Sequence, residues 1–176
     1  MPRYLIITVV IFVNALLLFV LNEANHLLAP LGVSLHGQAL AVLFAGLYLR
    51  VLHGAILSLL IGLLSSAAGP GDTGSLTLLF LLLWSGAVFM RRRIRREVKF
   101  QVRMTALLLQ TCAFLYLMLV FSGPWLTLPA FWLRVLADSA LSFIFVTAAS
   151  VAWVEFQIRL LESSGWDIRS ERPEDP

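Results

Sequence analysis

Long apolar runs, separated by short breaks of polar residues, glycine and proline, organise this chain. The runs cover residues 4–21, 37–68, 75–90, 104–121 and 134–156. The first contains 18 residues. A helix of that length extends about 27 Å at ~1.5 Å per residue, close to the ~30 Å hydrocarbon core of a bilayer. The pattern therefore predicts transmembrane helices.

The run 37–68 is too long for one crossing, because its 32 residues would make a helix of roughly 48 Å. Arg50 and His53 interrupt it. We therefore expect two helices, over 35–49 and 53–68, which gives six spans. A single helix over 37–68, giving five spans, is the alternative.

The breaks have the composition of loops. Residues 22–36 include Pro30 and Gly32, and a glycine and proline cluster covers 69–74. Because the polar stretch 22–26 follows the first run where a small-residue cleavage site would be needed, we interpret that run as a retained helix and not a signal peptide. Near the last break, Trp125, Phe131 and Trp132 are typical of an aromatic belt at the outer interface.

Composition supports this interpretation. Among 176 residues, 60% are apolar and 13% charged, which leaves too few polar side chains to cover a soluble core. We predict an all-α integral membrane protein, a single helical domain over 1–161. The polar residues 162–176 would form a largely disordered cytoplasmic tail.

A basic segment between the fourth and fifth runs orients the chain. Seven of the thirteen Lys and Arg residues lie in it: Arg91, Arg92, Arg93, Arg95, Arg96, Lys99 and Arg103. Positive charge in a short loop beside spanning segments stays in the cytoplasm. With six spans both termini are then cytoplasmic, and Arg134 is the one basic residue outside. Such a loop would bind anionic lipid headgroups rather than nucleic acid.

The small residues Gly54, Ser58, Gly62 and Ser66 recur every fourth position in the third predicted helix. In lipid, small residues at this spacing let two helix backbones approach closely. Packing inside the bundle is the favoured interpretation of this stripe, and contact with a partner protein is the alternative.

Few polar residues fall within or beside the predicted spans. Arg134 and Asp138 are four residues apart, which predicts a polar pair near the outer interface, and Glu155 lies at the cytoplasmic end of the sixth helix. Asn14 and Gln110 are expected to form hydrogen bonds between helices.

No chemistry-bearing motif emerges from the sequence. Three scattered histidines and the single Cys112 form no metal or redox set, and no HExxH, GxSxG or Walker motif occurs. We therefore expect no enzyme activity, no metal and no cofactor.

The stretch Gly54–Ser66, the breaker cluster 69–74 and the run into Arg91–Arg96 together resemble the rod-shape-determining MreD family. The family's Asp after Gly-Leu-Leu in helix 3 is replaced by Ser65 and Ser66, and its Pro-Asp before helix 2 by residues 36–38, so the resemblance is to a divergent member. It implies a non-enzymatic scaffold of the lateral-wall elongation machinery in the bacterial inner membrane. The implied partners are the bitopic protein MreC, peptidoglycan synthases and the actin-like filament protein.

The resemblance also implies a six-helix fold similar to the substrate-binding subunits of vitamin uptake transporters. A small-molecule binding subunit of such a transporter is accordingly the alternative function. Its pocket would draw on polar and aromatic residues at the external side: Asn22, Glu23, His26, Trp125 and Trp132.

Overall fold

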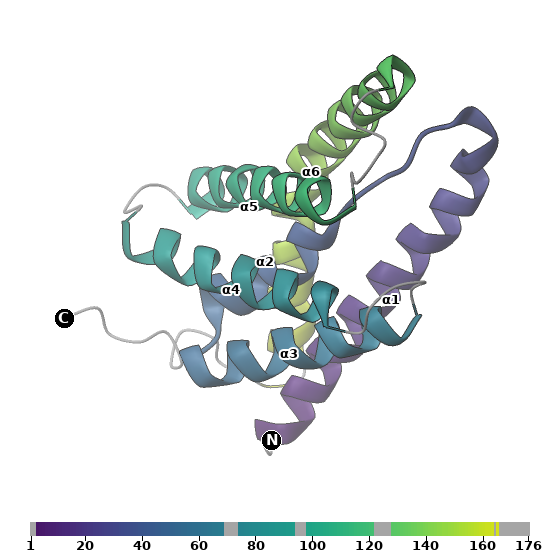
Figure 1. Cartoon of the computed structure of the whole chain (residues 1–176). Coiled ribbons are helices and arrows are strands. Elements are labelled where there is room, and N and C mark those ends of the chain that lie inside the picture. Colours follow the sequence, from purple (N-terminus) through teal and green to yellow (C-terminus); the bar gives the residue numbers. More distant parts are fainter. Residues whose placement is uncertain (1–2, 69–73, 94–97, 122–127, 164, 166–176) are drawn as a thin grey trace.

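The computed structural model describes residues 3–68, 74–93, 98–121, 128–163 and 165, and these form six α-helices and one short 3-10 helix with no strand (Figure 1). The elements are α1 (Arg3–Leu28), η1 (Ala29–Leu31), α2 (Gln38–Tyr48), α3 (Val51–Ala68), α4 (Ser75–Arg93), α5 (Val98–Phe121) and α6 (Pro129–Ser163). The predicted all-α class is confirmed.

Three of these helices, α1, α5 and α6, contain segments long and apolar enough to cross a membrane. The other three are shorter apolar helices. The helix α6 has 35 residues, about 52 Å at ~1.5 Å per residue, so it is longer than a hydrocarbon core requires.

The shortest helix, α2, lies at the centre of the bundle and contacts each of the other five α-helices. All its residues from Ala39 to Tyr48 are buried. A Cβ atom on Gly46 would collide with the Cβ of Ala87, so glycine lets the backbones of α2 and α4 approach closely. An all-apolar sequence around the whole circumference of α2 is therefore explained by burial on every side.

In contrast, α1 lies at the edge of the bundle. From Thr8 onward its buried residues are Val10, Asn14 and Leu21, which share one face, and α1 packs toward α2 and α3. Figure 1 shows α1 and the start of α6 extending past α3, α4 and α5, with the connection from α1 to α2 running between them.

The predicted division of 37–68 into two helices is confirmed, and one continuous helix is wrong. Leu49 is extended, with φ −87° and ψ 158°, and separates α2 from α3. The predicted ends were less accurate, because α1 continues seven residues past Leu21 and α5 starts at Val98 instead of 104. Predictions about Arg95, Arg96, Trp125, the cluster 69–73 and the tail 166–176 lie outside the described residues.

Candidate functional site

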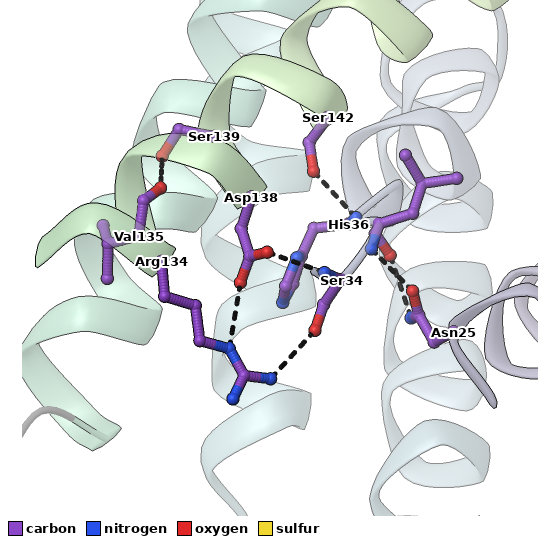
Figure 2. Close-up of polar contacts among 9 residues, drawn as sticks. Asn25, Ser34, His36, Arg134, Val135, Asp138, Ser139 and Ser142 are labelled. Carbon is purple, nitrogen blue, oxygen red and sulfur yellow. Dashed lines mark hydrogen bonds and ion pairs between the residues drawn. The ribbon is translucent and has the colours of Figure 1, made fainter. Parts of the chain in front are cut away.

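The most distinctive site is the extended segment 33–37, which joins η1 to the central helix α2. Backbone groups outside a helix or sheet need other hydrogen-bond partners when they lie within a bundle in lipid. Side chains from three surrounding helices provide those partners here, and Figure 2 shows the ones from α1 and α6.

From α1, the Asn25 side chain makes two hydrogen bonds with the backbone of Leu35. Its Oδ1 accepts from the Leu35 N–H at 2.5 Å, and its Nδ2 donates to the Leu35 carbonyl at 3.0 Å. The amide therefore replaces the pairing that a neighbouring β-strand would supply to this residue.

From α6, two side chains one helical turn apart accept from the segment. Asp138 Oδ1 accepts from the Ser34 N–H at 2.6 Å, and Ser142 Oγ accepts from the His36 N–H at 2.9 Å. Residues four apart share a helix face, and the alternate amides of an extended chain point the same way. The spacing of Asp138 and Ser142 thus matches that of the two amides.

From α5, Gln110 Nε2 donates to the His36 carbonyl at 2.9 Å, and the ring of Phe114 lies 5.2 Å from the imidazole of His36. Five backbone groups of Ser34, Leu35 and His36 consequently have side-chain partners. We call this arrangement the segment clamp, consisting of Asn25, Gln110, Asp138 and Ser142.

The predicted pair of Arg134 and Asp138 includes one clamp residue, Asp138. Arg134 Nε lies 3.8 Å from Asp138 Oδ2, and its Nη2 donates to Ser34 Oγ at 3.5 Å. The Asp138 side chain is 11% exposed and that of Arg134 59% exposed. Asp138 thus uses Oδ2 for the ion pair with Arg134 and Oδ1 to accept from the Ser34 N–H.

The small-residue stripe of α3 lies inside the bundle. A Cβ on Gly62 would lie 2.8 Å from Thr77 Cα, and one on Gly54 would lie 2.6 Å from Trp84 Nε1. Ser58 is fully buried, and Ser66 Oγ lies 3.2 Å from the hydroxyl of Thr77. The contacts support the packing interpretation, and they leave no room at Gly62 for a partner protein.

The described residues of the basic segment differ in their partners and in their exposure. Arg91 Nη1 donates to the Leu49 carbonyl at 3.0 Å, just past the end of α2, so this guanidinium acts as a helix cap. Lys99 and Glu155 form an exposed ion pair at 3.7 Å, and Arg103 is exposed. Arg92 and Arg93 lie in the last turn of α4.

One buried polar contact joins a residue that the sequence analysis identified to one that it did not. Gln157 Nε2 of α6 donates to Asn14 Oδ1 of α1 at 3.2 Å, and both side chains are almost completely buried. Asn14 was expected to bond between helices, but Gln157 lies beyond the predicted end of the sixth helix. An unbroken helical pattern past residue 156 was the signal that could have included it.

The external residues proposed for a small-molecule pocket are only partly brought together. Asn22 lines a cavity of about 400 Å³, whereas Glu23, His26 and Trp132 are absent from its described lining. Among the described residues no group of His, Cys, Asp and Glu could hold a metal ion.

In comparisons with known proteins, no family model, curated protein or solved structure matches the chain.

Proposed function

We propose that the chain crosses the bacterial cytoplasmic membrane six times, with both termini in the cytoplasm. The second crossing is the difficult one, since the 11 residues of α2 extend only about 16 Å. Residues 33–36, between the left-handed Gly32 and Gly37 at φ −129° and ψ 22°, add up to about 13 Å at ~3.3 Å per residue. The two lengths together are close to the ~30 Å core. The segment clamp supports this proposal, because it satisfies backbone groups that lipid cannot.

We further propose that the protein is a non-enzymatic scaffold of the MreD type, which assembles with a single-pass membrane protein similar to MreC. Peptidoglycan synthases and the actin-like filament protein would be further partners in the same assembly. The stretch that carries the family resemblance is also the tightly packed pair α3 and α4, in which Gly54 and Gly62 allow close contact. This pair would form the rigid part of the scaffold.

The observation that carries the scaffold proposal is the free face of α1. Large apolar side chains at helical spacing are strongly exposed on it: Phe12, Leu16, Phe19, Val20 and Leu27. A spanning helix held to its own bundle along one narrow face leaves the other available to a partner's transmembrane helix. The partner surface is therefore proposed on α1 and not on the small-residue stripe of α3.

Site-specific photocrosslinking in membranes of the native host tests this proposal. A photoreactive residue replaces Phe12 or Phe19 on α1, and Leu115 on α5, itself 57% exposed, serves as the matched control. We expect crosslinks to one single-pass protein related to MreC from the α1 positions and none from Leu115. Equal crosslinking at all three positions would contradict the assignment of the partner surface.

The same membranes test the alternative of a vitamin uptake subunit. Purification in mild detergent, with mass spectrometry of proteins and small molecules, would then yield an energy-coupling ATPase module or a stoichiometric vitamin. Recovery of either would overturn the scaffold proposal. Recovery of the single-pass partner without them supports it.

A further inference from the structure

A cavity of about 400 Å³ lies beside the segment clamp, on the side away from α5 and α6. Four helices and the extended segment contribute to its wall. The lining residues are Ala15, Leu18, Phe19, Leu21, Asn22, Asn25, Leu35, Gly37, Gln38, Leu64, Ser65, Leu76 and Phe80. This volume is within the ~300–1,000 Å³ typical of small-molecule sites.

The cavity opens sideways, between α1 and α3. Phe19 on α1 and Leu64 on α3 both line it, yet their side chains are 60% and 52% exposed. In helices that cross a membrane, exposed large apolar side chains face the hydrocarbon. A ligand would therefore enter from the lipid.

The interior is apolar with a few neutral polar groups. None of the described lining residues carries a charge. Two of their buried polar atoms, Gln38 Oε1 and Ser65 Oγ, have no hydrogen-bond partner within the described part of the chain. Asn25 also lines the cavity, but its amide is committed to Leu35.

We propose that this cavity binds an uncharged single-chain amphiphile from the bilayer, with a hydroxyl group in its head. The chain would lie against Leu18, Leu76 and Phe80. Gln38 Oε1 is buried in the wall of the cavity, and the hydroxyl would donate to it once the side-chain amide turns toward the cavity. A charged head is disfavoured because the lining offers no counter-charge. This inference goes beyond the scaffold role and does not depend on it, although Phe19 belongs both to the proposed partner surface and to the cavity lining.

Binding of 1-monooleoylglycerol to the full chain in nanodiscs, counted by native mass spectrometry, tests the proposal. Methyl oleate is the matched probe, since it has the same chain without hydroxyl groups. We expect saturable binding of the monoacylglycerol and about tenfold weaker binding of methyl oleate, the equivalent of one hydrogen bond. Absence of saturable binding by the wild-type protein would overturn the proposal.

Two variants locate the site. Ala15→Trp fills the cavity and should abolish binding, whereas Leu115→Trp on the exposed face of α5 should not change it. Gln38→Leu removes the unpaired acceptor and should eliminate the tenfold preference without unfolding the bundle. A folded Ala15→Trp protein that binds normally, or a Gln38→Leu protein with an intact preference, would show that the amphiphile binds elsewhere.

Discussion

The segment clamp explains why particular polar residues occur in an otherwise apolar bundle. Asn25, Gln110, Asp138 and Ser142 all accept from or donate to backbone groups of the same three residues. A buried backbone group left without a partner costs about 1–3 kcal/mol. The clamp residues are therefore expected to stabilise the fold rather than to transfer protons.

Asp138→Ala tests this role at the charged residue of the clamp. The substitution removes the acceptor of the Ser34 N–H and the carboxylate that pairs with Arg134, and we expect the free energy of unfolding to fall by about 1–3 kcal/mol. Asp138→Asn keeps a carbonyl oxygen in the same place and should lose less. Thermal or denaturant unfolding in detergent measures both.

Ser139→Ala is the matched control on the same helix. Ser139 Oγ donates to the Val135 carbonyl of its own helix and to no other group in the described part of the chain, so we expect a change within about 0.5 kcal/mol. Similar losses for the Asp138→Ala and Ser139→Ala proteins would contradict the role assigned to the clamp.

Only part of this site could be predicted from the sequence. Arg134 and Asp138 are four residues apart, and local helix geometry was enough to pair them. Ser34 lies 104 residues from Asp138, and His36 lies 106 residues from Ser142. Such contacts depend on how α6 packs against the α1–α2 connection, which no local pattern encodes.

At the scale of elements, the close contact between α3 and α4 depends on glycine residues, which have no side chain to keep the two helices apart. Gly62→Ala would place a methyl group against the backbone of Thr77, which cannot move as a flexible side chain can. We expect a loss of about 1–3 kcal/mol from this overpacking. Unfolding of the purified protein in detergent measures it.

The control for this prediction lies on α4. A Cβ on Gly86 would meet only Leu109 Cδ2, at 3.2 Å, and that atom is the end of a flexible side chain. We expect Gly86→Ala to be neutral or stabilising, because alanine favours helix more than glycine. An equal loss at both glycines would show that the α3 stripe is not specially packed.

The join between α2 and α3 depends on Arg91. Its guanidinium donates to the Leu49 carbonyl, which follows the last residue of α2. We expect Arg91→Ala to destabilise the bundle by roughly 1.5–3 kcal/mol, the range for hydrogen bonds to charged groups. The exposed Arg103→Ala should change stability little, and equal effects would contradict the capping role.

The sequence predicted the helical type of the six elements correctly but not their lengths. Apolar runs identified six helices, but hydropathy marks where helices leave the apolar region and not where helical hydrogen bonding stops. Residues 22–28 are largely polar yet continue α1, until Pro30 and the left-handed Gly32, at φ 70°, end it through η1. Likewise α6 continues through Glu155 and Gln157 to Ser163.

At the scale of the whole molecule, the proposed six-span topology requires a second crossing made partly of α2 and partly of the non-helical segment before it. The buried α2 and the clamped segment together are about as long as the hydrocarbon core, and the proposed topology puts Arg50 in the cytoplasm. Leu31 and Arg50 should therefore lie on opposite sides of the membrane. Both residues are exposed, and Leu31 is 73% exposed.

Cysteine labelling with a membrane-impermeant maleimide is the most direct measurement of this claim. Cys112, which is exposed, is first replaced by alanine, and Leu31→Cys and Arg50→Cys are then made separately. We expect Leu31→Cys to be labelled in intact spheroplasts and Arg50→Cys to be labelled only after the membrane is disrupted. Labelling of both positions under the same condition would mean that residues 32–49 do not cross the membrane, and would contradict the six-span account.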